Sequence, residues 1–109
     1  MDGKYLGKIE SVRLGNGGYQ DAMFGLSLTF VFGCAISTFN GTWGLDISCE
    51  NARWTEDDRD REFAATMRLI NQTMRDAKVK ELSELKGIPV EVTIERWALK
   101  SWRVLTEVL

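Results

Sequence analysis

Apolar and polar residues alternate most regularly in the segment "FGLSLTFVF", residues 24–32. Five large apolar residues occupy every second position: Phe24, Leu26, Leu28, Phe30 and Phe32. A period of two over this length is typical of a β-strand with one buried face. The preceding segment "YLGKIESVRL" has the composition of a strand, with imperfect alternation. Between them, "GNGGYQD" (Gly15 to Asp21) predicts a turn, because its glycines and its Asn accept positive φ at little cost.

The segment "CAISTFNGTWGLDI" predicts a β-hairpin. Asn40-Gly41 is a favourable pair for a type I′ turn, in which both central residues have positive φ. A two-residue turn there would place four residues on one half-buried face: Ile36, Thr38, Trp43 and Leu45. Trp43 is therefore expected in the sheet rather than in a loop. Gly33, just before this segment, interrupts the alternation and is expected to bend or bulge the chain.

A long amphipathic helix is predicted after the hairpin. Thr55 is followed by three acidic residues, which is the pattern of an N-cap and an acidic first turn. The helix is expected to run from about Glu56 to about Ala77. Its apolar stripe recurs at steps of three and four: Phe63, Met67, Ile70, Met74 and Ala77. The charged run "EDDRDRE" is interpreted as the solvated first two turns of this helix.

The last part of the chain predicts a short helical turn and two strands. The helical turn is "ELSELKG", ended by Gly87. In "PVEVTIE", the three β-branched aliphatic residues share one face of a strand. "RWALK" is expected to be a turn, and "SWRVLTEVL" is expected to be the final strand, with Trp102 in phase with Val104. The C-terminus is therefore expected to be tied into the sheet.

Together these elements predict an α+β fold. An antiparallel β-sheet of about five or six strands would carry one long helix packed on one face, in the order β-β-β-β-α-β-β. The length of 109 residues suits a single domain, residues 1–109. The chain contains no repeat, no low-complexity tract and no linker-like segment.

Composition and charge narrow the function classes. The net charge is −2, which argues against a sequence-blind affinity for nucleic acid, because such affinity needs a basic surface. No apolar run approaches the roughly 20 residues that cross a bilayer, and "MDGKYLGKIE" lacks the apolar region of a signal peptide. A cytoplasmic protein without a membrane partner is therefore expected. Cys34 and Cys49 are expected to be reduced, structural thiols that behave as small buried hydrophobes.

The residue inventory does not favour an enzyme. The chain has no histidine, which removes Ser-His-Asp and Cys-His nucleophile activation and histidine-containing metal sites. The carboxylates at the helix start diverge from one another and are interleaved with arginines, so no metal site is predicted. The glycine-rich turn lacks the Lys-Ser/Thr of a phosphate loop, and no cofactor is predicted.

Aromatic residues combined with arginines are the remaining constellation. Tryptophan stacking with arginine on phosphate holds nucleotides and single strands, and the same residue types dominate protein-interface hot spots. Tryptophans also fill the cores of small domains, the interpretation favoured for Trp102 and Trp43. The candidate surface joins the predicted Gly15–Asp21 turn to the segment Asn51–Arg59, and Trp97 is expected to be exposed in its turn. The ligand- or partner-binding candidates are Tyr19, Gln20, Trp43, Arg53, Trp54, Arg59 and Trp97.

Several phrases of the sequence resemble a group of small proteins of tailed phages and prophages. They are "GKIESVRLGNGGYQDAMFGLSLTF", "GTWG", "RWTEDDRDREF", "DAKV", "LKGIPVEV" and "LKSWRVLTEVL". The similarity covers nearly the whole chain, and the C-terminal phrase is the most specific. No biochemical activity is established for this group, so the resemblance implies a setting and no catalytic residues.

The phage setting implies a non-enzymatic binding protein that counters host antiviral defence in the host cell cytoplasm. It would bind a host defence protein or sequester a nucleotide second messenger. Tyr19 and Trp54 would stack or form hot spots, and Arg53 and Arg59 would clamp anions or carboxylates. The alternatives are a nucleic-acid-binding accessory protein of phage replication or recombination, a structural or assembly component, and an enzyme that uses carboxylates, Cys49 or Tyr19. Strand pairing at a sheet edge would favour a homodimer or a higher homo-oligomer.

Overall fold

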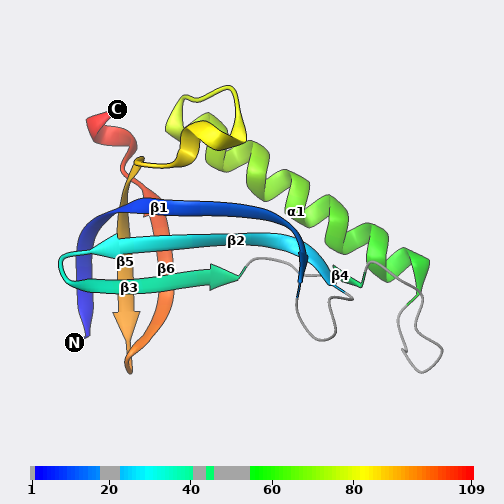
Figure 1. The fold of residues 1–109 in the computed structure, drawn as a ribbon, viewed down its shortest axis with the longest axis horizontal. Helices are drawn as coiled ribbons and strands as arrows, with labels where there is room; N and C mark the ends of the chain where they lie inside the picture. Colours follow the sequence, from blue (N-terminus) through cyan, green and yellow to red (C-terminus); the bar gives the residue numbers. More distant parts are fainter. Residues whose placement is uncertain (1, 18–22, 41–43, 46–54) are drawn as a thin grey trace.

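The computed structural model describes residues 2–17, 23–40, 44–45 and 55–109. The elements are β1 (Gly3–Gly17), β2 (Met23–Phe32), β3 (Ala35–Asn40), β4 (Gly44–Leu45), α1 (Glu56–Ala77), the 3₁₀ turn η2 (Leu82–Leu85), β5 (Pro89–Glu95), β6 (Ala98–Val104) and the 3₁₀ turn η3 (Thr106–Val108). The strands form one antiparallel sheet in the order β3-β2-β1-β5-β6, and β4 pairs with β2 (Figure 1). The α+β class predicted from the sequence is confirmed.

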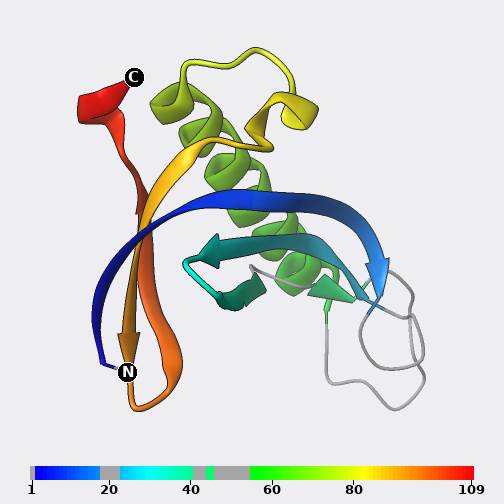
Figure 2. The same ribbon diagram turned by 60° about the vertical axis from the view of Figure 1, so that its left-hand side comes forward.

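Strand β1 belongs to both halves of the sheet. Its first half pairs with β5, and its second half pairs with β2. A register shift between Ile9 and Ser11 marks a bulge where the two halves meet. Bulges bend a strand and increase its twist, so the sheet curls instead of lying flat. Figure 1 shows β5 and β6 running across the direction of β2 and β3, and Figure 2 shows β1 bending from one half to the other.

The curled sheet forms a partly open barrel. Its edge strands β3 and β6 meet through Phe39 and Trp102, whose ring centroids are 5.6 Å apart. Within the described part of the chain these two strands share no backbone ladder. Inward-facing apolar residues of β1, β2, β5, β6, α1 and η2 form one core, against which Ala35 and Phe39 of β3 pack: Ile9, Leu26, Leu28, Phe30, Phe32, Ile70, Ala77, Leu85, Val90, Val92, Ile94 and Val104. The alternating pattern of residues 24–32 is confirmed as the inner face of β2.

Gly7 lies where the two halves of β1 join. A Cβ built on Gly7 would overlap the backbone carbonyl oxygen of Val31 and would lie 2.9 Å from Cβ of Phe32. Real Cβ atoms do not approach a carbonyl oxygen so closely, and a paired strand backbone has little freedom to retreat. Glycine at this position therefore permits the close approach of β1 and β2 that curls the sheet.

The hairpin lies at a different place from the one predicted. Gly33 and Cys34 form the two-residue loop between β2 and β3, with Phe32 opposite Ala35. Gly33 has φ +62°, the positive value that a type II′ turn needs at its first central residue. The prediction of a hairpin at Asn40-Gly41 is wrong. β3 and β4 do not pair with each other, because both pair with β2 along the same edge. Cys34 is exposed in the turn, so its prediction as a buried thiol is also wrong.

The helix α1 has the predicted bounds and the predicted cap. The backbone N–H of Asp58 donates to Thr55 Oγ1 over 3.1 Å, and the backbone N–H of Thr55 donates to Asp58 Oδ2 over 3.0 Å. This reciprocal pair is a capping box, which satisfies donors that the helix itself leaves without partners. At the other end Lys78 adopts the left-handed conformation that commonly terminates helices.

The buried stripe of α1 differs from the predicted one. Its buried residues are Thr66, Ile70, Thr73 and Ala77, whereas Met67 is 62% exposed. Thr73 is compatible with burial because its hydroxyl donates to the Leu69 carbonyl over 2.7 Å. The apolar pattern correctly predicted that Ile70 and Ala77 are buried. It did not predict the burial of Thr66 and Thr73, which lie on the same face of the helix.

Three predicted segments also have different bounds in the structure. Gly15 to Gly17 belong to β1, so the predicted Gly15–Asp21 turn is wrong for these three residues, and the rest of that segment lies outside the described residues. In the "RWALK" segment only Arg96 and Trp97 form the turn, and β6 begins at Ala98. The last residues form η3 instead of a strand.

Substitution of Gly7 tests the close approach in β1. We expect Gly7→Ala to lower the free energy of unfolding by about 1–3 kcal/mol or more, because the added methyl group meets backbone rather than a movable side chain. Gly15→Ala is the matched control on the same strand, since a Cβ there meets nothing within 4 Å. Urea denaturation should show the control within about 1 kcal/mol of the parent. Equal stabilities for the two variants would contradict the proposed role of Gly7.

The capping box should make helix stability depend on pH. The Thr55 backbone N–H, then the Thr55 hydroxyl and Arg61, hold the pKa of the Asp58 carboxyl below its usual range. A depressed pKa contributes stability that is present above the ordinary Asp value of about 3.9 and is lost as the pH falls through the lower, folded-state pKa. The stability difference between the parent and Asp58→Asn should therefore be full near neutral pH and shrink in acid. A difference that stays constant from neutral pH into acid would count against this account.

Candidate binding surface

The structure describes two of the seven binding candidates. Tyr19, Gln20, Trp43, Arg53 and Trp54 lie outside the described residues. Arg59 lies in the first two turns of α1, and Trp97 lies in the turn between β5 and β6. Figures 1 and 2 place the start of α1 and the β5–β6 turn at different ends of the fold. The structure therefore does not bring Arg59 and Trp97 into one site.

Arg59 is engaged within its own helix. Its Nη2 atom lies 3.5 Å from Glu56 Oε1, one turn earlier on α1. The Arg59 side chain is 30% exposed, whereas the Glu56 side chain is almost fully exposed. Such a pair on a helix surface contributes little to stability, so the guanidinium can still exchange its partner for another anion.

The β5–β6 turn presents Trp97 to solvent in an unusual backbone conformation. Trp97 is 78% exposed, and both Arg96 (φ 53°) and Trp97 (φ 65°) have positive φ. Two successive positive φ values are what a two-residue type I′ turn requires, and such turns usually contain Asn-Gly. For a bulky residue this conformation is an outlier that persists only when the surrounding structure enforces it.

Contacts from both sides hold this turn. The backbone N–H of Arg96 donates to Asp2 Oδ1 over 2.9 Å. On the other side, Lys100 Nζ lies 2.8 Å from Glu95 Oε2, and this contact raises the pKa of Lys100. The role of Asp2 was not found from the sequence, because only the pairing of β1 with β5 brings Asp2 beside the turn.

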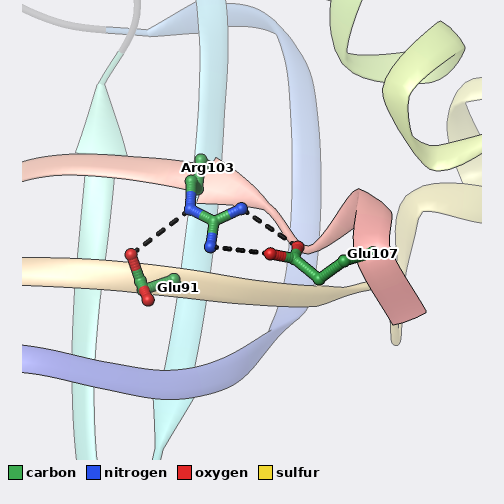
Figure 3. A network of polar contacts seen from close by, with 3 residues as sticks. All are labelled: Glu91, Arg103 and Glu107. Carbon is green, nitrogen blue, oxygen red and sulfur yellow. Dashed lines mark hydrogen bonds and ion pairs between the residues drawn. The ribbon is translucent and has the colours of Figure 1, made fainter. Parts of the chain in front are cut away.

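Arg103 and Arg96 differ in whether their guanidinium groups are already bound to carboxylates. Figure 3 shows that Arg103 donates to Glu91 across the strand pair and to both carboxylate oxygens of Glu107 in η3. The hydrogen bonds to Glu107, followed by the one to Glu91, raise the pKa of the Arg103 guanidinium. The Arg96 guanidinium makes no ion pair with any of the described residues. Of these two arginines, Arg96 is therefore the one free to meet an anionic ligand.

A shallow groove separates the two sheet edges beside the turn. We call it the β3–β6 groove, and it is lined by Phe39, Leu99, Lys100, Ser101 and Trp102. The half-buried Trp102 ring packs on Phe30 at 5.1 Å between centroids and on Phe39 at 5.6 Å. Trp102 therefore packs on core residues, as predicted, and its side chain also lines the groove.

Charge is unevenly distributed over the molecule. β2 and β3 contain no charged residue, and their outer face carries hydroxyl and amide groups. There Ser27 Oγ donates to Asn40 Oδ1 over 2.7 Å, and the hydroxyls of Thr29 and Thr38 are 3.4 Å apart. Acidic side chains gather instead in the first turns of α1. Around the β5–β6 turn the charges are mixed, since Asp2 and Glu95 lie beside Arg96 and Lys100.

Comparison of the chain with protein families, characterised proteins and solved structures finds no match. Across the residues that the structure describes, no group of three or more Cys, Asp or Glu side chains is arranged to hold a metal ion. No helix of the described residues is long and apolar enough to span a membrane.

Replacing the turn by Asn-Gly should reveal its strain. We expect the double variant Arg96→Asn/Trp97→Gly to gain about 1 kcal/mol in free energy of unfolding, because Asn and Gly accept positive φ at lower cost than Arg and Trp. Chemical denaturation measures this gain, and Asp2→Ala is the companion variant, expected to lose stability by freeing the Arg96 amide. If the Asn-Gly variant were less stable than the parent, Arg96 or Trp97 would be making favourable contacts that outweigh the strain.

Proposed function

We propose that this protein is a non-enzymatic binding protein that holds a nucleotide ligand at the β5–β6 turn. In the phage setting implied by its sequence, it would counter host defence in the host cell cytoplasm by sequestering a nucleotide signal. The observation that carries this proposal is the exposed Trp97 next to Arg96, whose guanidinium has no ion-pair partner in the part of the chain that the structure describes. A tryptophan face binds a nucleobase by stacking, and a guanidinium binds phosphate.

The strain in the turn supports a functional role for these two residues. Arg and Trp are poor choices for two successive positive φ values, and Asn-Gly would fit the same backbone at lower cost. Strained conformations concentrate at ligand-binding positions, where the surrounding structure maintains them. Here the maintenance comes from Asp2 and from the fully buried β5 residues Val90 and Val92.

The topology supports the same ligand class by analogy. A bent first strand shared by two sheet halves, a helix between the third and fourth strands of the barrel, and facing third and fifth strands together resemble the oligonucleotide/oligosaccharide-binding fold. In that fold the hairpin equivalent to β5–β6 is one of the ligand-binding loops. The analogy concerns the fold and does not identify the ligand.

The second candidate is an accessory protein that binds single-stranded nucleic acid during phage replication or recombination. The barrel topology favours it directly, because single strands bind such barrels by stacking on aromatic side chains along a groove. The two candidates share the same contact chemistry at Trp97 and differ in the source of the ligand. Binding of a host defence protein by the same tryptophan is the outcome that would replace both.

Native mass spectrometry of the protein recovered from phage-infected, defence-carrying cells tests the proposal. We expect an added mass that absorbs like a nucleotide and leaves on denaturation. Trp97→Ala should reduce affinity for that ligand about fivefold to hundredfold, because stacking on one aromatic contributes about 1–3 kcal/mol.

Met67→Ala is the matched control, since Met67 is also a large exposed apolar residue but lies on α1. The control should bind as the parent does and both variants should melt with it. Recovery of bare protein, or of a complex with a host protein, would overturn nucleotide sequestration.

A further inference from the structure

We propose that the β3–β6 groove continues the binding site from the β5–β6 turn, so that the ligand is a single-stranded oligonucleotide rather than a mononucleotide. This inference rests on the nucleotide contact proposed above at Trp97, and its ligand is the single-stranded nucleic acid of the second candidate function. The groove residues Leu99 to Trp102 follow Trp97 directly along β6. One aromatic platform therefore stands at the turn, and a second, formed by Trp102 with Phe39, lies further along the same strand.

The spacing of the two platforms sets the length of the ligand. Trp97 and Trp102 are five positions apart, which is about 16 Å for an extended strand at about 3.3 Å per residue. A stacked single strand advances about 3.4 Å per nucleotide. The span is therefore about five such steps, so a strand of about six nucleotides is needed to place a base on each platform, whereas a mononucleotide can contact only one.

The polar side chains of the groove suit a phosphate backbone. Lys100 and Ser101 are exposed at its rim, so they can offer an ammonium group and a hydroxyl to phosphate oxygens. The opposite wall comes from β3, which carries no acidic residue that would repel phosphates. An apolar peptide would use the aromatic floor equally well but would gain nothing from the ammonium group, and this difference favours the nucleic acid.

Glu95 competes with a bound phosphate for Lys100. Its carboxylate lies 2.8 Å from the ammonium group, and both side chains are about half exposed. Exposed ion pairs of this kind are weak and screened by salt, so a phosphate can replace Glu95 as the partner of Lys100. The pair thus keeps Lys100 at the groove in the free protein, next to the turn that carries Trp97.

Fluorescence anisotropy with labelled mixed-base single strands, prepared as DNA and as RNA, tests this arrangement. Strands of one, two, six and nine nucleotides bracket the predicted length of about six. We expect affinity to rise at least about tenfold between two and six nucleotides and then to level off. Ser101→Glu and Lys100→Gln should each remove most of that rise.

Lys80→Gln is the charge-matched control, because Lys80 is exposed in the bend after α1 and lies outside the groove. It should retain the full length dependence. Trp97-dependent binding that is equal for all lengths would overturn the groove proposal and leave the proposed function standing. Binding of none of the strands, together with no nucleotide in the native complex, would overturn both. A rise with length that survives Ser101→Glu and Lys100→Gln would place the extended contacts elsewhere and also overturn the groove.

Discussion

The approach of the β1 and β2 backbones at Gly7 is the constraint on which the rest of this structure depends. The next residue, Lys8, pairs with both β5 and β2, and at Gly7 there is no space for a side chain between β1 and β2. Together with the bulge after Ile9, this contact curls the sheet. Curling brings the far edges β3 and β6 close enough for Phe39 and Trp102 to touch. The groove between those edges is therefore a consequence of the geometry of β1.

The β5–β6 turn shows how a stable framework supports a strained exposed element. β5 is anchored by three inward residues that are nearly or fully buried: Val90, Val92 and Ile94. The same strand leads directly into Arg96 and Trp97, whose positive φ values cost free energy. Because the β5–β6 ladder and Asp2 fix the ends of the turn, the strain stays local. An exposed tryptophan on a rigid support loses little conformational entropy on binding, which favours its use as a contact residue.

Charged side chains are distributed differently over the helix and over the sheet. Acidic residues at the start of α1 complement the helix dipole and form the capping box, so their charge has a structural explanation. Strands β2 and β3 are free of charge, and Arg103 is neutralised by Glu91 and Glu107. Near the groove, Lys100 is paired with Glu95, and the Arg96 guanidinium has no ion-pair partner among the described residues. A net charge summed over the whole chain hides this arrangement, because screening makes each surface region act mainly on its own surroundings.

The sequence by itself determined the elements whose signals are local. Thr55 and the acids after it defined the start of α1, and the period of two defined β2, because capping and side-chain alternation act within a few residues. It also singled out Trp97 as exposed in a turn. The sequence misplaced the hairpin at Asn40-Gly41, where local turn propensity was outweighed by continued pairing of the chain with β2. Only the tertiary structure decided which strands are neighbours, that Asp2 supports Arg96, and that Phe39 meets Trp102. These contacts join residues far apart in the chain, so their free energy depends on the packing of the whole sheet and leaves no local pattern to read.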